Sequence, residues 1–158
     1  MSMSESEPFS TTIRAERQKY LRPIVLGILG GWFAEILFIV VQGVILYPGN
    51  PIWVMMFWGL FCGTGMGAVA GVFASLFVVD RYEGTKAVVP GIVAIFIPYA
   101  ACGYFCYEIA LNTNYYGAVE MGWIFVAKNM VLSFVGAVLI SLALFTERGR
   151  AIVEKFGL

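Results

Sequence analysis

Four long apolar stretches separate three short clusters of charged residues in this 158-residue chain. The clusters occupy residues 1–22, 80–86 and 146–158. Hydrophobic residues make up 60 % of the chain and charged residues 13 %. A soluble domain of this size could not bury such stretches, because soluble domains are about half apolar and about a quarter charged. The sequence therefore predicts an all-α membrane protein, a bundle of four transmembrane helices joined by short loops.

The apolar stretches predict four membrane spans, at residues 23–46, 52–79, 87–111 and 123–145. Each exceeds the roughly 20 residues that cross the hydrocarbon core of a bilayer. Residues 1–22 should form a mobile tail followed by a short basic helix at the membrane surface. Pro23 marks the expected entry to the first span. Residues 146–158 should form a short C-terminal segment.

The basic residues predict how the chain sits in the membrane. Nine of the ten flank the spans on one side: Arg14, Arg17, Lys19, Arg22, Arg81, Lys86, Arg148, Arg150 and Lys155. The tenth, Lys128, lies inside the fourth span. Cytoplasmic loops are enriched in Lys and Arg. We therefore expect a multi-pass protein of the cell (inner) membrane with both termini in the cytoplasm.

Small residues recur every four positions in the second span: Gly59, Gly63, Gly67, Gly71 and Ser75. Lipid tails provide no hydrophobic reason for helices to associate, so close backbone packing between small residues drives much of the association. This ridge predicts a tightly packed partner helix, which could come from the same chain or from another subunit.

Glu35 lies near the middle of the first span, and Gln42 returns to nearly the same helical face. A carboxylate at that depth costs at least about 2.5 kcal/mol, so intramembrane acidic residues are candidates for function. Two interpretations stay open. A protonated Glu35 could hydrogen-bond a neighbouring helix as a structural contact, or it could handle a proton, an ion or a substrate.

Glu108 and Lys128 are two further charges inside predicted spans, and Asn129 is adjacent to Lys128. Both charges lie toward the outer end of their helices, at depths that permit a salt bridge. Such a pair would neutralise two costly charges. A structural ion pair is one interpretation, and a polar vestibule open to the outside is the other.

The chain contains no histidine, which is the usual axial ligand of haem and a common ligand of copper and zinc. Cys102 and Cys106 share a helical face, but two thiols alone make a weak metal site, and we expect them to serve packing. We predict no metal site and no cofactor bound by histidine in this chain. Pigments, quinone or haem would need ligands from partner subunits, whereas bound lipids are expected. The net charge of zero offers no attraction for nucleic acid.

Two functions fit these features. The first is an accessory or structural subunit of a larger membrane complex, of respiratory, photosynthetic or transport type. Its partners would be other integral membrane subunits or copies of itself. The alternative is a small oligomeric transporter, or an ion- or proton-conducting subunit, that uses Glu35. No nucleophile–base set supports a lipid-modifying enzyme, so we do not expect the chain to be catalytic by itself.

Overall fold

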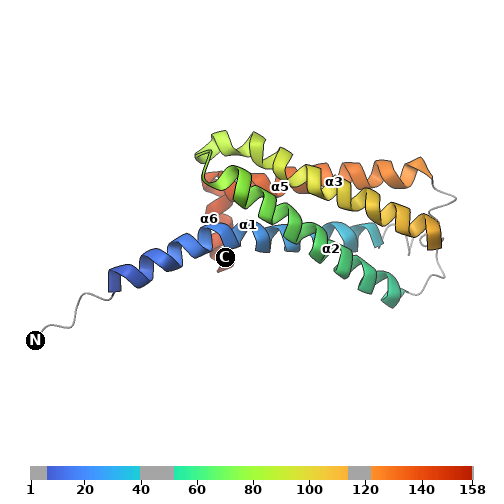
Figure 1. The fold of residues 1–158 in the computed structure, drawn as a ribbon, viewed down its shortest axis with the longest axis horizontal. Coiled ribbons are helices and arrows are strands. Elements are labelled where there is room, and N and C mark those ends of the chain that lie inside the picture. Colours follow the sequence, from blue (N-terminus) through green and yellow to red (C-terminus); the bar gives the residue numbers. More distant parts are fainter. Residues whose placement is uncertain (1–6, 40–51, 114–121, 158) are drawn as a thin grey trace, which may run out of the picture.

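The computed structural model describes residues 7–39, 52–113 and 122–157 (Figure 1). The elements are α1 (Glu7–Ile39), α2 (Ile52–Ala74), the π-helix η2 (Ser75–Val79), the 3-10 helix η3 (Gly84–Ala87), α3 (Val88–Thr113), α5 (Trp123–Phe145) and α6 (Glu147–Lys155). Four helices are long and apolar enough to cross a membrane. This confirms the predicted all-α chain with four such helices. A helix satisfies its own backbone hydrogen bonds, which the apolar bilayer core requires.

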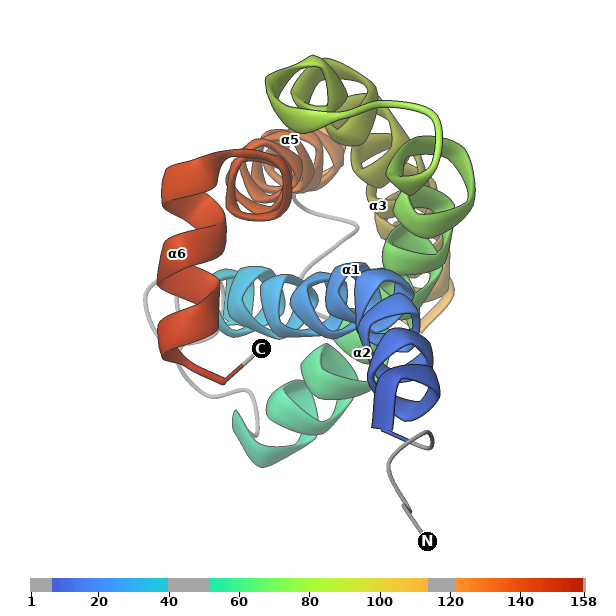
Figure 2. The same cartoon turned by 90° about the vertical axis from the view of Figure 1, so that its left-hand side faces the viewer.

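The first helix differs from its prediction at the N-terminal side. α1 runs without interruption through Pro23, so the predicted short basic helix and the first span are one helix. A proline inside a helix removes one backbone hydrogen bond and bends the axis. The first half of α1 indeed turns away from the second half (Figure 2). The predicted end of this span, at residue 46, lies outside the described residues.

The four long helices pack as a closed ring. α1 packs mainly on α2, α2 on α3, α3 on α5, and α5 on α1, and the last of these contacts is the smallest. α6 runs across the end of the bundle at a steep angle to the long helices (Figure 2). The loop between α2 and α3 lies at the same end (Figure 1). We call this the basic end, because Lys86, Arg148 and Arg150 are found there.

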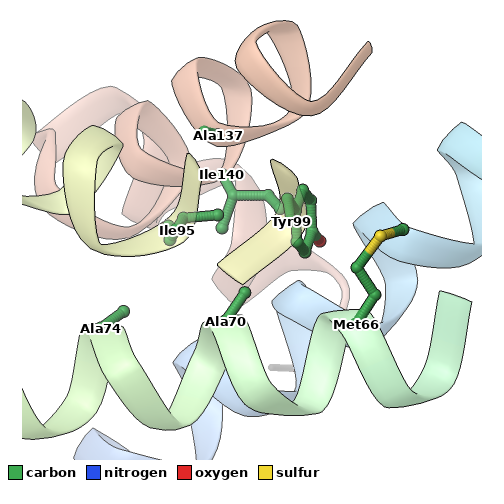
Figure 3. Close-up of a cluster of buried hydrophobic side chains, with 7 residues drawn as sticks. All are labelled: Met66, Ala70, Ala74, Ile95, Tyr99, Ala137 and Ile140. Atoms are coloured by element: carbon green, nitrogen blue, oxygen red, sulfur yellow. The ribbon is translucent and has the colours of Figure 1, made fainter. Parts of the chain in front are cut away.

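The core lies between α2, α3 and α5, where small residues face large ones (Figure 3). α2 contributes Ala70 and Ala74, which are fully buried, and α3 contributes Tyr99, which is also fully buried. Large apolar side chains cover the outside of the bundle; Phe33, Phe61, Phe105 and Val131 are each more than 60 % exposed. This inside-out distribution suits a protein whose outer surface is solvated by lipid.

Glycines bring the backbones of α1 and α2 into direct contact. A Cβ atom added at Gly67 would overlap the Gly27 carbonyl group. A Cβ atom at Gly63 would lie 2.8 Å from the carbonyl carbon of Gly31, which is closer than real Cβ atoms approach. Only glycine permits this spacing, so these four residues determine how closely the two helices pack.

The contact continues toward the basic end. A Cβ atom at Gly71 would meet the backbone of Ile24, and the Ser75 hydroxyl donates a 3.0 Å hydrogen bond to the Tyr20 carbonyl. Gly59, the first member of the predicted ridge, is buried. The structure therefore places most of this ridge against α1 of the same chain.

Candidate functional site

Polar side chains from three helices meet inside the bundle, next to α2. Glu35 of α1, Tyr99 of α3, and Asn129 and Ser133 of α5 line one small cavity, together with Ala34, Met66 and Leu132. We call these four polar residues the central polar cluster. The cavity volume of about 10 Å³ is at the lower limit for one water molecule. Two residues singled out by the sequence, Glu35 and Asn129, are thus brought together.

Glu35 is half-buried and continues the α1 face that holds Gly27 and Gly31. The Cys62 thiol on α2 lies close enough to the Glu35 carboxyl group to interact with it electrostatically. Glu35 also lines the small cavity, so its carboxyl group can hydrogen-bond a molecule placed there.

Asn129 connects α5 to α3. Its Nδ2 group donates a 3.1 Å hydrogen bond to the backbone carbonyl of Gly103. A Cβ atom at Gly103 would lie 2.5–2.7 Å from the Asn129 amide, so a glycine is needed at that position. Asn129 therefore keeps its side-chain oxygen for other partners while its nitrogen is tied to α3.

Tyr99 connects α3 to α1 across the centre of the bundle. Its side chain is fully buried, and its hydroxyl donates a 2.6 Å hydrogen bond to the Gly27 carbonyl. Tyr99 was not among the residues that the sequence singled out. A signal was present, because membrane tyrosines concentrate at the two interfaces, whereas Tyr99 is in the interior of its span.

The expected ion pair between Glu108 and Lys128 is not formed. The described residues form two ion pairs, Lys19–Asp80 and Arg22–Glu154, both at the basic end. The Glu108 carboxyl group instead lies near the Tyr104 hydroxyl, one turn earlier on α3. Similar depth in two helices does not make two side chains face each other.

The sequence also singled out three further residues, Gln42, Cys102 and Cys106. Gln42 lies outside the described residues. Cys102 is a free thiol on α3, and the side chain of Cys106 is outside the described set. Within the described part of the chain, no group of three or more His, Cys, Asp or Glu side chains is arranged to hold a metal ion.

A second charged cluster stands at the basic end. Asp80 accepts a 2.6 Å hydrogen bond from the Lys19 ammonium group and a 2.5 Å hydrogen bond from the Tyr20 hydroxyl. The hydrogen bond from Lys19, followed by that from Tyr20, holds the pKa of the Asp80 carboxyl group below its usual value. These contacts tie the first half of α1 to the end of η2.

No protein-family model matches the chain, and no curated protein or solved structure is similar to it. Its chemistry is therefore inferred from the central polar cluster. Glu35 supplies a group that can bind and release a proton, and Ser133 supplies a hydroxyl that can donate or accept a hydrogen bond. Together with space for about one water molecule, this set is suited to proton exchange and unsuited to holding a large substrate.

Proposed function

We propose that this chain is a small membrane transporter or proton-conducting subunit in which Glu35 binds and releases a proton inside the bundle. One observation supports the proposal above others. Glu35, a carboxylic acid within a predicted span, lines a one-water cavity shared with Asn129 and Ser133. Intramembrane carboxylates that line a cavity mark proton relays and ion pathways in many membrane proteins.

The cluster suggests how proton loss would be accommodated. A charged Glu35 needs hydrogen-bond donors, and the Ser133 hydroxyl lines the same cavity, which has space for about one water molecule. Ser133 belongs to α5, whose contact with α1 is the smallest in the ring. Deprotonation would therefore draw α1 and α5 together, and protonation would release them. Proton binding at Glu35 would therefore change how closely α1 and α5 pack, at the smallest helix contact in the ring.

The proposed orientation follows from the charges at the basic end. Lys19, Arg22, Lys86 and Arg148 are all at this end, and cytoplasmic loops are rich in such residues. We place the basic end, and with it both termini, in the cytoplasm of a cell (inner) membrane. Protons would then move between Glu35 and one or both aqueous sides of that membrane.

Proton flux into liposomes tests the proposal. The purified protein would be reconstituted with a pH-sensitive dye inside, and flux would be recorded after a pH step. We expect flux above that of empty liposomes for the wild type and for Glu108→Gln, the matched control at the other intramembrane acid. Glu35→Gln keeps the side-chain shape but cannot release a proton, so its flux should fall to the empty-liposome level. Wild-type flux no higher than background, or unchanged flux in Glu35→Gln, would refute the proposal.

A second candidate function, a subunit of a larger membrane complex, is favoured by a notch on the lipid-facing surface. The Trp32 indole N–H donates a 2.7 Å hydrogen bond to the Thr64 hydroxyl, and both residues are exposed. Beside them Gly65 is exposed, and a Cβ atom there would meet nothing within 4 Å. An open glycine flanked by polar groups offers a close approach to a helix of another membrane subunit or of a second copy.

The mass of the protein in mild detergent tests this second function. We expect native mass spectrometry to show a species heavier than the monomer for the wild type. Gly65→Leu would fill the notch and release the monomer. Ala101→Leu places the same side chain at an exposed position of α3 and should leave the heavier species intact. A monomeric wild type would exclude the subunit function. If the two variants showed the same mass, the surface around Gly65 would not be the contact site.

A further inference from the structure

A cleft of about 1360 Å³ opens at the basic end of the bundle. Its walls come from the first half of α1, from the segment between η2 and α3, and from the junction of α5 with α6. It therefore opens beside the contact between α1 and α5, the smallest of the four in the ring. The volume exceeds the roughly 300–1,000 Å³ of common small-molecule pockets, so there is room for part of a large amphiphile.

The charged lining of the cleft favours an anion. Five basic side chains line it (Lys19, Arg22, Lys86, Arg148 and Arg150), against three acidic ones (Asp80, Glu83 and Glu147). Asp80 is already paired with Lys19 at 2.6 Å. Lys86 and Arg148 form no ion pair with any described residue. Two cations are thus available to an incoming negative group.

Arg22 adds an unsatisfied donor to the same wall. Its Nε–H is buried and has no hydrogen-bond partner, and its Nη1 atom lies 3.5 Å from a Glu154 oxygen. A buried donor without an acceptor costs about 1–3 kcal/mol, so such groups generally have a partner. The guanidinium fork matches the oxygen geometry of a phosphate group. A phosphate group in the cleft would pair with the Arg22 guanidinium, which lines the same wall.

The apolar lining and the setting indicate a lipid. Val79, Leu144 and Phe145 form an apolar part of the wall, where the cleft meets the membrane-spanning helices. Ile152 of α6 and Phe156, which directly follows α6, are exposed together with basic residues of that helix. Short helices of this composition lie in the headgroup region of a bilayer with the apolar side chains directed inward. The cleft therefore opens at the depth of lipid phosphates.

We propose that this cleft binds the phosphate headgroup of an anionic phospholipid of the surrounding membrane. Arg22, Lys86 and Arg148 contact the phosphate, and the acyl chains leave the cleft along the apolar wall formed by Val79, Leu144 and Phe145. Glu35 does not line this cleft, so the lipid-binding proposal can be tested separately from the proton-handling function.

Lipid binding to the purified full chain in neutral detergent tests this site. Phosphatidylglycerol and phosphatidylcholine would be titrated separately, and one-to-one complexes would be counted by native mass spectrometry. We expect phosphatidylglycerol to bind and phosphatidylcholine not to bind. Lys86→Gln and Arg148→Gln should each weaken binding about five-fold, the effect of removing one basic residue near an anionic lipid. Because neither residue forms an ion pair among the described residues, both variants should fold.

Two controls make the result decisive. Lys155→Gln removes a basic residue of α6 that does not line the cleft, so binding should be unchanged. Inorganic phosphate and glycerol phosphate should compete weakly, because they lack the acyl chains. Equal binding of the two lipids, no binding of phosphatidylglycerol, or an equal loss in Lys155→Gln would overturn the proposal. Full displacement by inorganic phosphate would assign the cleft to a soluble phosphate compound instead.

Discussion

The Tyr99 hydroxyl donates a 2.6 Å hydrogen bond to the backbone carbonyl of Gly27. This bond joins α3 to α1, which are diagonal neighbours in the ring of helices. Tyr99 is fully buried and also lines the cavity beside Glu35. Its hydroxyl therefore connects the glycine contact between α1 and α2 to the central polar cluster.

Removing this hydroxyl should loosen the bundle. Tyr99→Phe keeps the ring and deletes the hydrogen bond, and we expect a loss of about 0.5–1.5 kcal/mol in the free energy of unfolding. Unfolding by SDS in mixed micelles measures the change. Tyr104→Phe on the same helix is the control, because Tyr104 is half exposed. Equal stability of Tyr99→Phe and the wild type would show that the bond contributes nothing.

Alanine substitution of an α2 glycine should change the stability of the protein in a direction that depends on whether the glycine faces α1. Gly67→Ala would force a methyl group into the Gly27 carbonyl, and overpacking of this kind costs about 1–3 kcal/mol. Gly65→Ala, two residues earlier, meets nothing within 4 Å and should stabilise α2 by up to about 1 kcal/mol, since alanine is the better helix former. Unfolding in mixed micelles should therefore shift in opposite directions. A destabilised Gly65→Ala or a neutral Gly67→Ala would contradict the packing of α1 on α2.

Most of the fold could be predicted because the bilayer leaves few choices. An apolar stretch such as 123–145 must form a helix, and α5 spans Trp123–Phe145. Pro23 misled the prediction, because proline marks a helix start in many proteins. In α1 it lies where Gly71 of α2 packs against the backbone, and the helix continues through it. The residues around Pro23 do not reveal this packing against α2, so the sequence alone placed a helix boundary there.

The site was harder to predict than the fold. Depth in the membrane can be counted along a sequence, and that count predicted Glu35 as a mid-span residue. The direction in which a side chain points depends on how each helix is rotated, which a single sequence does not encode. That rotation brings Asn129 to the Glu35 cavity and leaves Lys128 without the Glu108 ion pair. Tyr99 was missed because an aromatic residue in an apolar span resembles ordinary packing.

Acid should weaken the contact between Asp80 and α1. Because the pKa of Asp80 is lower in the folded chain, its hydrogen bonds with Lys19 and Tyr20 stabilise the fold above its unfolded pKa of about 3.9. That stabilisation is lost as the pH falls through the lowered pKa. The unfolding temperature of the wild type should exceed that of Asp80→Asn at pH 6, and the gap should close toward pH 3. Glu83→Gln, in the same loop, should follow the wild type; a constant gap for Asp80→Asn would contradict the assignment.

The attachment of α6 to α5 depends on the Thr146 side chain. Its hydroxyl oxygen accepts a 3.0 Å hydrogen bond from the Gly149 backbone N–H, which caps the first turn of α6. Loss of such a cap costs about 0.5–2 kcal/mol, so Thr146→Ala should speed amide hydrogen exchange across α6. Thr146→Ser retains the cap and should restore protection, while exchange in α5 should stay slow in both variants. Since Arg148 lines the cleft from α6, the Ala variant should also weaken phosphatidylglycerol binding. Packing also holds α6 on α5, because a Cβ atom at Gly149 would overlap the Leu142 carbonyl. Unchanged hydrogen exchange in α6 would show that this packing is sufficient without the cap.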